Sequence, residues 1–277
     1  MTPPFRRAWL PLAAALAAAP ALAACAGPRP GPAFRPWTGY EDRPAGYLPR
    51  GGAPDAARLL PGPPAEGSPR AAADLAVYRA TRTLQGSARW ALAAADADID
   101  TPRAPAALAC ALGVEPSPER TPALVTLLGR VMSDVDSSLQ GAKAAFARPR
   151  PFVAEPRPVC VSPVPPWLAK SGSYPSGHAA TGWAWSLVMA QVAPDRAEAL
   201  QRRGLAYGDS RVVCGVHYLS DVEAGRAVGA AVVARLNTDA AFRADVGRAR
   251  RELAAARAAQ PPARCPAEAR ALDRPAF

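Results

Sequence analysis

The sequence predicts a single all-α domain, and three observations support this fold class. Alanine, the strongest helix former, makes up about a quarter of the 277 residues. Apolar residues recur at intervals of three, four and seven in several proline-free stretches, as they do on one face of a helix. No stretch shows the alternation of apolar and polar residues that is typical of a strand between hairpin turns. The expected domain covers residues 70–260 and contains no internal repeat.

The first 24 residues are expected to form a signal peptide rather than a membrane-spanning helix. Arg6 and Arg7 precede an uncharged run at residues 8–24, which is shorter than the roughly 20 apolar residues that a spanning helix needs. The run ends in Leu-Ala-Ala-Cys at residues 22–25, which resembles the lipobox of bacterial lipoproteins. Cys25 is therefore the expected lipidation site, and ordinary cleavage beside an incidental cysteine is the alternative. We expect a periplasmic protein, anchored to the outer membrane if Cys25 carries lipid.

Residues 25–69 are rich in Pro and Gly and are expected to form a tether and an extended arm. Helices are expected over residues 72–97, 121–147, 178–192, 197–207, 220–236 and 241–260, before a C-terminal tail at 261–277. Residues 148–176 contain eight prolines and are expected to form a long loop. Because loops of this length inside a compact domain are uncommon and often functional, we expect this one to shape a binding pocket.

The formal net charge is +10, from 33 Lys and Arg against 23 Asp and Glu. The basic residues are dispersed among acidic ones rather than gathered in one block, which argues against a nucleic-acid partner. After Cys25, no uncharged run approaches the length of a membrane span, so we do not expect an integral membrane enzyme. No pattern in the sequence specifies an oligomeric state.

The cysteines predict disulfides rather than a metal site. Four cysteines follow Cys25, and an even number in an exported chain indicates two disulfides with three possible connectivities: Cys110, Cys160, Cys214 and Cys265. No Cys-x-x-Cys pair and no His-rich cluster indicates zinc. We therefore expect neither a metal nor another cofactor.

Three segments contain the residue types that are rare in this chain. Lys143 and Arg150 are seven residues apart, close to two helical turns, so both cations can face one side. The second segment, Ser176-Gly177-His178, follows a Gly/Ser-containing loop and begins a predicted helix. Because the first N–H groups of a helix have no partner within it, such a start can bind an anion.

The third segment contains Arg211, His217 and Asp221, with the aspartate four residues after the histidine. The neighbouring Ser220-x-x-Glu223 is typical of a capping box at a helix start. Taken alone, each segment has a structural interpretation: a solvated helix face, an N-cap, or a His–Asp pair. Taken together, they supply three cations, a helix start and both histidines, which suits holding a tetrahedral oxyanion and transferring a group through histidine.

The pattern Lys-x6-Arg-Pro, Pro-Ser-Gly-His and Ser-Arg-x5-His-x3-Asp resembles the signature of the phosphatidic acid phosphatase type 2 superfamily. The resemblance is closest to the bacterial class A non-specific acid phosphatases, and it covers residues 46–245. The resemblance also rests on residues 54–55, 59–64 and 74–78, and on Gly172-Ser-Tyr directly before Pro-Ser-Gly-His. The resemblance implies a single helical bundle of the acid phosphatase and vanadium-dependent haloperoxidase type. It further implies an exported enzyme that hydrolyses small phosphate monoesters.

The resemblance also implies a role for each site residue. His217 is the expected nucleophile, Asp221 its hydrogen-bond acceptor, and His178 the general acid and then base. Five groups are expected to hold the phosphate oxygens: Lys143, Arg150, Arg211, the Ser176 hydroxyl and the Gly177 N–H. Such a site stabilises the transition state with fixed donors and needs no metal. His178 must be protonated when the alcohol leaves and neutral when it activates water. This requirement predicts a pH optimum of activity below neutrality.

These roles predict the disulfide pairing. If Arg150 and Arg211 bind one phosphate, the nearby Cys160 and Cys214 converge to a distance at which a disulfide can form. Cys110 is then left to pair with Cys265. Buried free thiols are the alternative.

Three other functions were weighed against the acid phosphatase. A lipid phosphatase of the same superfamily generally has several spanning helices, and a vanadium haloperoxidase is usually much larger. A catalytically inactive envelope lipoprotein is the third, but every position of the signature is occupied. The acid phosphatase is therefore the preferred interpretation.

Overall fold

The computed structural model describes residues 1, 39, 41–256, 262–273 and 275–277. The uncharged run of the predicted signal peptide and the predicted lipidation site Cys25 lie outside the described residues. From residue 39 onward the described residues belong to one compact unit. Their secondary structure is helical, with no strand among them, which confirms the predicted all-α fold class. None of the helices in these segments is both long enough and apolar enough to cross a membrane.

Six long helices build the domain: α2 (Pro69–Thr81), α5 (Pro122–Leu139), α9 (Gly177–Val192), α10 (Ala197–Val213), α11 (Leu219–Leu236) and α12 (Ala240–Ala256). Shorter helices lie between and after them: α1 (Ala56–Leu59), α3 (Ala88–Ala95), α4 (Ala109–Leu112), α6 (Ala142–Phe146), α7 (Pro151–Ala154), α8 (Pro166–Lys170) and α13 (Cys265–Ala271). Three 3-10 segments complete the described elements: Arg82–Leu84, Ala104–Leu108 and Pro194–Arg196.

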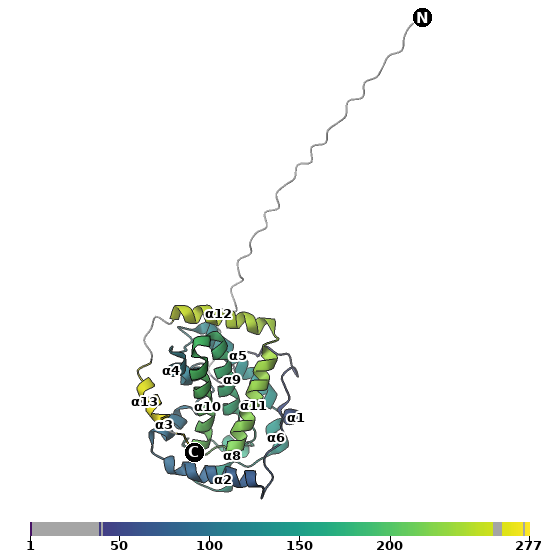
Figure 1. Ribbon diagram of the computed structural model, residues 1–277. Coiled ribbons are helices and arrows are strands. Elements are labelled where there is room, and N and C mark those ends of the chain that lie inside the picture. Colours follow the sequence, from purple (N-terminus) through teal and green to yellow (C-terminus); the bar gives the residue numbers. More distant parts are fainter. Residues whose placement is uncertain (2–38, 40, 257–261, 274) are drawn as a thin grey trace. The chain divides into compact units, whose positions relative to one another are not determined.

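Helices α9, α10 and α11 run side by side, and α5 packs against α9 (Figure 1). Helix α12 crosses one end of this bundle, and α2 crosses the other end and contacts α10 and α11. The backbone N–H of Ser220, at the start of α11, donates to Oδ1 of Asp74 on α2 at 2.9 Å. The backbone N–H of Ser176, just before α9, donates to the carbonyl of Asp221 at 2.9 Å. The starts of α9 and α11 therefore meet at the end of the bundle that α2 covers.

Buried apolar side chains of α5, α9, α11 and α12 form the main core. Trp185 of α9 is almost fully buried there, and its indole N–H donates to the carbonyl of Leu128 at 2.9 Å. Helix α11 packs closely on α9 because two of its residues are glycines. A Cβ at Gly225 would collide with the carbonyl oxygen of Ser176, and one at Gly229 with that of Ala180. This close packing holds the starts of the two helices together.

Two predicted helices are each interrupted in the structure. Within residues 72–97, α2 ends at Thr81 and α3 begins at Ala88, after Gly86 adopts a φ of +79° and the Ser87 hydroxyl accepts the N–H of Trp90 at 3.2 Å. Positive φ is accessible to glycine at little cost, and serine is a favoured N-cap. Within residues 121–147, α5 ends at Leu139 and α6 begins at Ala142.

Helix α10 continues to Val213, whereas the prediction ended it at Tyr207. Gly208, a poor helix former, directly follows the predicted end. In the structure a Cβ there would lie 3.0 Å from Nη2 of Arg226, so the glycine makes room for α11 rather than ending the helix. The predicted loop at 148–176 likewise contains two short helices, α7 and α8.

The described part of the predicted arm packs on the domain. Asp134 of α5 accepts the backbone N–H of Tyr47 at 2.8 Å and that of Leu48 at 3.0 Å, and the Tyr47 hydroxyl donates to Asp245 of α12 at 2.7 Å. The predicted tail contains α13, and Arg264 just before it donates to Glu115 at 2.8 Å. Both segments thus extend the packed domain beyond the predicted limits of residues 70–260.

Candidate active site

The three segments singled out in the sequence line one cavity of about 570 Å³. Six of the predicted site residues line it: Lys143, Arg150, Gly177, His178, Arg211 and His217. The other two, Ser176 and Asp221, are fully buried and lie behind these residues. The Ser176 hydroxyl accepts the N–H of Ala179 at 3.3 Å and so caps α9. The cavity therefore holds a cationic cluster beside two imidazoles and the first turn of a helix.

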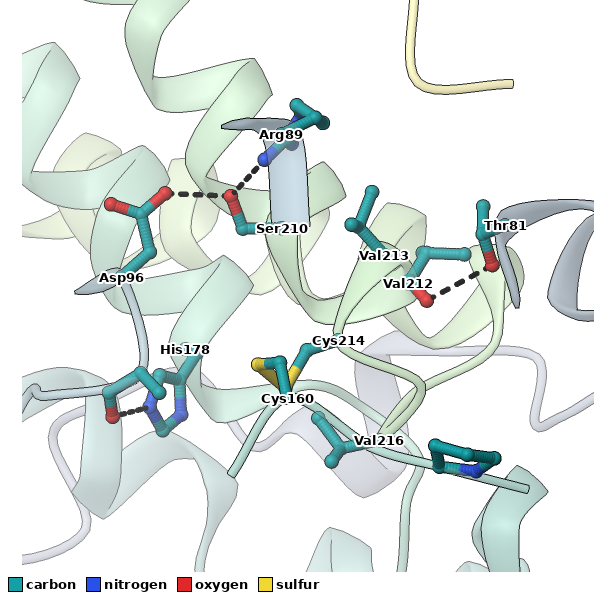
Figure 2. The surroundings of a disulfide bond; sticks show 12 residues. Thr81, Arg89, Asp96, Cys160, His178, Ser210, Val212, Val213, Cys214 and Val216 are labelled. Carbon is teal, nitrogen blue, oxygen red and sulfur yellow. Dashed lines mark hydrogen bonds between the residues drawn. A yellow bond between two sulfur atoms is a disulfide. The ribbon is translucent and has the colours of Figure 1, made fainter. Parts of the chain in front are cut away.

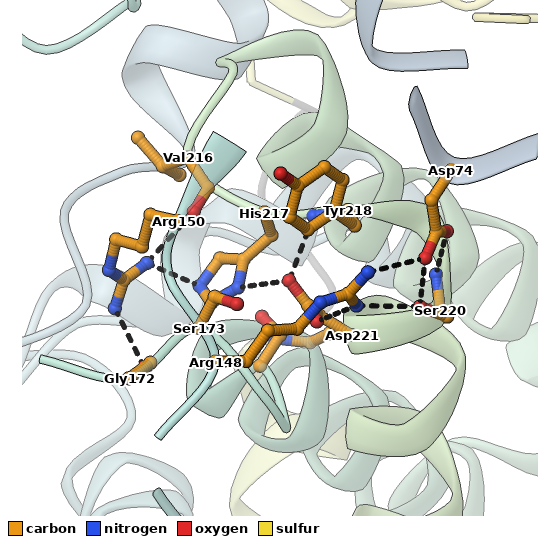
Figure 3. Close-up of polar contacts among 12 residues, drawn as sticks. Asp74, Arg148, Arg150, Gly172, Ser173, Val216, His217, Tyr218, Ser220 and Asp221 are labelled. Atoms are coloured by element: carbon orange, nitrogen blue, oxygen red, sulfur yellow. Dashed lines mark hydrogen bonds and ion pairs between the residues drawn. The ribbon is translucent and has the colours of Figure 1, made fainter. Parts of the chain in front are cut away.

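His217 lies between a cation and a carboxylate, which fixes its tautomer (Figure 3). Its Nε2 is 3.0 Å from Nη1 of Arg150, and its Nδ1 is 3.4 Å from Oδ2 of Asp221. A guanidinium can only donate, so Nε2 must accept and the ring proton sits on Nδ1, facing Asp221. Burial, followed by the charges of Arg150 and Lys143, lowers the pKa of His217 well below its usual range. The ring is thus held neutral with the lone pair of Nε2 at the cavity.

Behind Asp221 lies an ion-pair network that the sequence analysis did not identify. Nη1 of Arg148 donates to Oδ1 of Asp221 at 2.6 Å, and Nη2 donates to Oδ2 of Asp74 at 2.8 Å (Figure 3). The Ser220 hydroxyl donates to the same oxygen of Asp74. Burial raises the pKa of Asp221, and Arg148 opposes that rise. One signal was present, because Arg148-Pro149 repeats the Arg-Pro dipeptide at residues 150–151.

Asp221 also has a second structural role, which corrects the predicted helix start. Helix α11 begins at Leu219, and Oδ2 of Asp221 accepts the backbone N–H of Tyr218 at 2.8 Å. The predicted capping box of Ser220 and Glu223 does not form, because Ser220 is already inside the helix and Glu223 pairs with Arg70. One carboxylate therefore caps the helix and contacts the histidine.

The three cavity cations differ in how they are held. Arg150 donates to the carbonyls of Ser171 at 3.1 Å and Val216 at 2.9 Å, and burial with the nearby Arg211 lowers its pKa to about 10. Nζ of Lys143 donates to the carbonyl of Gly172 at 3.0 Å, and burial with the nearby Arg150 lowers its pKa to about 8. In Arg211, Nε and Nη1 are buried and have no hydrogen-bond partner among the described residues.

The unpartnered nitrogens of Arg211 are donors that could bind an anion in the cavity. Only 3% of the residue is exposed, and burial lowers the pKa of its guanidinium. A buried donor without a partner is costly, and a buried charge without a counterion costs more. A tetrahedral oxyanion would satisfy these donors together with those of Lys143 and Arg150.

His178, the first residue after Gly177 in α9, is held by a backbone carbonyl. Its Nε2 is 3.0 Å from the oxygen of Ala97, so Nε2 carries a proton and Nδ1 remains for proton exchange (Figure 2). Asp96, the residue before Ala97, is held in place by three hydrogen bonds. Its carboxylate accepts from the Ser210 hydroxyl at 2.6 Å and from Arg203 at 2.6 and 3.1 Å. Burial, followed by the charge of Arg211, lowers the pKa of His178 well below its usual range.

Two disulfides are present, in the pairing expected from the sequence. Cys160–Cys214 joins the loop after Arg150 to the end of α10, with a Cα–Cα distance of 4.6 Å (Figure 2). The backbone N–H of Cys160 also donates to the carbonyl of Cys214 at 3.0 Å. Cys110–Cys265 joins α4 to α13, with a Cα–Cα distance of 5.3 Å. The first disulfide therefore connects the two segments that carry Arg150 and Arg211.

Further cavity residues were not identified from the sequence, because they come from segments without a motif. Acidic and apolar side chains of three regions line the same cavity: Glu41, Ile99, Asp100, Met132, Asp136 and Leu139. Trp167 of α8 lines it as well and is 60% exposed. No group of three or more His, Cys, Asp or Glu residues arranged to hold a metal ion occurs within the described segments.

This chain is similar to one known family and to several known proteins. Residues 122–243 match the family model of the PAP2 superfamily. An acid phosphatase of Zymomonas mobilis subsp. mobilis is 41% identical over 195 residues, which cover 70% of this chain and 74% of that protein. A non-specific acid phosphatase of Salmonella typhimurium is 38% identical over 195 residues, covering 70% and 78%. A solved bacterial vanadium-dependent iodoperoxidase matches with a TM-score of 0.46 at 19% identity, covering 65% of this chain and 53% of that one. The region matched by the family model contains all the predicted site residues from Lys143 to Asp221.

Proposed function

Since this chain belongs to the non-specific acid phosphatases of the PAP2 superfamily, we propose that it hydrolyses small phosphate monoesters through a phosphohistidine at His217, without a metal ion. The observation that carries the proposal is the pair of buried, unpartnered nitrogens of Arg211 in the cavity that also contains Lys143, Arg150 and both histidines. The three cations bind the phosphate oxygens, and the first N–H groups of α9 add further donors.

In the first half-reaction, Nε2 of His217 attacks phosphorus and the bond to the ester oxygen breaks. The leaving alcohol takes a proton from Nδ1 of His178, so no free alkoxide forms. His217 becomes positively charged as the nitrogen–phosphorus bond forms, and Asp221 stabilises that charge through the proton on Nδ1. Arg150, which donates to Nε2 in the free enzyme, turns its donor to a phosphate oxygen.

In the second half-reaction, the now neutral His178 takes a proton from water. The resulting hydroxide attacks phosphorus, the nitrogen–phosphorus bond breaks, and inorganic phosphate leaves with His217 neutral again. Because burial and Arg211 lower the pKa of His178, the acid form required in the first step is populated at low pH. The dianionic phosphate favours that protonated form once it is bound.

Hydrolysis of 4-nitrophenyl phosphate with and without a chelator tests this mechanism. We expect unchanged activity with chelator and competitive inhibition by vanadate, which resembles the pentacoordinate transition state. Loss of activity on chelation that zinc or magnesium restores would overturn the metal-independent mechanism.

We also propose that the chain is exported through the signal peptide at residues 1–24 and that Cys25 is lipidated. The support is the sequence itself: two arginines, an uncharged run and Leu-Ala-Ala-Cys at residues 22–25. Mass spectrometry of the mature N-terminus tests both steps. A lipid-modified Cys25 is expected, and an unmodified mature N-terminus at Ala24 or Cys25 would contradict lipidation.

A further inference from the structure

The cavity also contains side chains that are chemically unlike the cationic cluster. Three carboxylates line it, those of Glu41, Asp100 and Asp136, together with apolar side chains and Trp167. A site that only needed to bind phosphate would have no use for acidic groups, which repel that ion. These acidic groups therefore suit a part of the substrate other than its phosphate.

The position of His178 places the leaving group beside one of these carboxylates. Nε2 of His178 donates to the carbonyl of Ala97 at 3.0 Å. Three residues further along the same turn, Asp100 lines the cavity, next to the buried Ile99. The proposed general acid must contact the leaving oxygen, so the alcohol part of the ester lies against this turn.

Two of the three carboxylates remain available to a substrate. Asp136 forms an ion pair with Arg43, which offsets its charge, and the charge of Arg43 also acts on Asp100 without a direct ion pair. Asp100 and Glu41 are exposed, and none of the described residues forms a hydrogen bond or a salt bridge with either carboxylate. The cavity therefore contains two carboxylates without a hydrogen-bonded partner among the described residues, in addition to its three cations, and one of them, Asp100, lies on the turn that holds His178.

Trp167 adds an exposed aromatic face to the same cavity. The residue lies on the short helix α8, is 60% exposed and lines the same cavity. An exposed indole face attracts ammonium groups, and most strongly those substituted with alkyl groups. An aromatic face combined with nearby carboxylates is the usual chemistry for recognising a substituted ammonium.

From this arrangement we infer that the enzyme selects phosphate monoesters whose alcohol carries an ammonium group, such as choline or ethanolamine. The phosphate binds at Lys143, Arg150 and Arg211, and the ammonium lies near Asp100 and Trp167. An alcohol with a second phosphate is disfavoured for the same electrostatic reason. The inference rests on the phosphatase function proposed above and adds its substrate class.

The test compares phosphocholine with 3,3-dimethylbutyl phosphate, in which a carbon atom replaces the charged nitrogen at almost equal size. The measured quantity is the ratio of the two kcat/KM values in each variant. Both esters react in the same protein sample, so partial misfolding cancels from the ratio. The intrinsic difference in reactivity between the esters also cancels when variants are compared.

We expect Asp100→Asn to lower the ratio about threefold to fivefold, as is usual for losing one partly exposed charge pair. Trp167→Leu should lower it by a similar factor, and added salt should lower it in the wild-type enzyme. The matched control is Asp98→Asn, because Asp98 is exposed on the same turn but lines a different cavity. This control should leave the ratio unchanged.

The outcomes separate the two proposals. If the wild-type enzyme and the three variants hydrolyse both esters and Asp100→Asn leaves the ratio at its wild-type value, the ammonium preference is wrong and the phosphatase mechanism stands. If the wild-type enzyme hydrolyses neither ester nor 4-nitrophenyl phosphate, the mechanism is wrong and the preference is refuted with it.

Discussion

Arg148 donates to one oxygen of Asp221 at 2.6 Å, while the other oxygen of that carboxylate lies 3.4 Å from Nδ1 of His217. The arginine is only 11% exposed and also pairs with Asp74. Burial alone raises the pKa of Asp221, and Arg148 is the largest opposing influence. Arg148 therefore favours the ionised form of Asp221 and limits the rise in pKa that burial causes.

The first prediction concerns Arg148→Met. Without the guanidinium, the pKa of Asp221 rises further, so the carboxylate takes up a proton at a higher pH and no longer accepts from His217. The acidic limb of the pH–rate profile should therefore move to higher pH, and kcat should fall at least about tenfold. Leaving Asp74 and Asp221 buried without their partner should also cost about 3 kcal/mol of unfolding free energy.

Arg79→Met is the control for that variant. It removes an exposed ion pair with Glu155, in which the arginine is 56% exposed, from the same helix as Asp74. We expect a loss of at most about 1 kcal/mol and an unchanged pH profile. A wild-type pH profile in Arg148→Met would contradict the role of Arg148 in holding Asp221 ionised.

The second prediction uses two arginines of α10 that are both 3% exposed. Arg203 is paired with Asp96 and Glu268, whereas two nitrogens of Arg211 have no partner among the described residues. Arg203→Met should therefore destabilise the protein by about 3–5 kcal/mol, and Arg211→Met should stabilise it by about 1–3 kcal/mol. Thermal unfolding of both variants without phosphate gives the comparison.

The same measurement with phosphate shows what Arg211 binds. A ligand that binds the folded state raises its stability with concentration, so phosphate should raise the Tm of the wild-type enzyme. The rise should be much smaller in Arg211→Met. An equal phosphate-induced rise in both proteins would show that Arg211 does not hold the anion.

The third prediction separates the two histidines. His217→Ala should abolish phosphoenzyme formation, measured by rapid quench and peptide mapping at alkaline pH, where phosphohistidine survives. His178→Ala should lower the rate about 10²–10⁴-fold for alkyl phosphates. It should lower the rate far less for 4-nitrophenyl phosphate, whose leaving group departs without a proton. Label on His178 and none on His217 would reverse the two roles.

The role of His178 as general acid also predicts how the pH–rate profile depends on the leaving group. The pKa of His178 is lowered, and the acid form is needed for poor leaving groups. Activity on alkyl phosphates should therefore fall as the pH rises through that lowered pKa, while activity on 4-nitrophenyl phosphate should extend to higher pH. Identical basic limbs for both substrates would contradict the role of His178 as general acid.

The sequence was sufficient to single out residues that lie together around one cavity, because their chemistry and spacing are unusual. Only two histidines occur in the chain, and each is next to residues that suit anion binding. Helix α9 was predicted to within one residue, because Ser176 is a strong N-cap and no proline occurs within the helix. Local signals of this kind do not depend on the rest of the fold.

Long-range contacts were not predictable in the same way. Asp74 and Arg148 are 74 residues apart and become partners only when α2 crosses the end of the bundle. Asp100 and Trp167 reach the cavity from a turn and from a proline-rich segment, neither of which has periodicity that would place it. The continuation of α10 past Gly208 was not predictable either, because a glycine that ends a helix and one that admits a neighbouring helix look the same in a single sequence.

The last prediction concerns the disulfide between Cys160 and Cys214. It closes a segment of 54 residues and joins the loop after Arg150 to the end of α10, which carries Arg211. In the chain-entropy model a loop of this size corresponds to about 4 kcal/mol of stabilisation. Cys160→Ser with Cys214→Ser should therefore lower the Tm and also raise KM, because Arg150 and Arg211 are no longer tied together.

The matched control is Cys110→Ser with Cys265→Ser, which removes a disulfide between α4 and α13, away from the cavity residues. The control should lower the Tm without changing KM. Equal effects of the two double variants on KM would show that the first disulfide stabilises the fold without aligning the site, and peptide mapping that recovers Cys160 joined to another cysteine would refute the pairing.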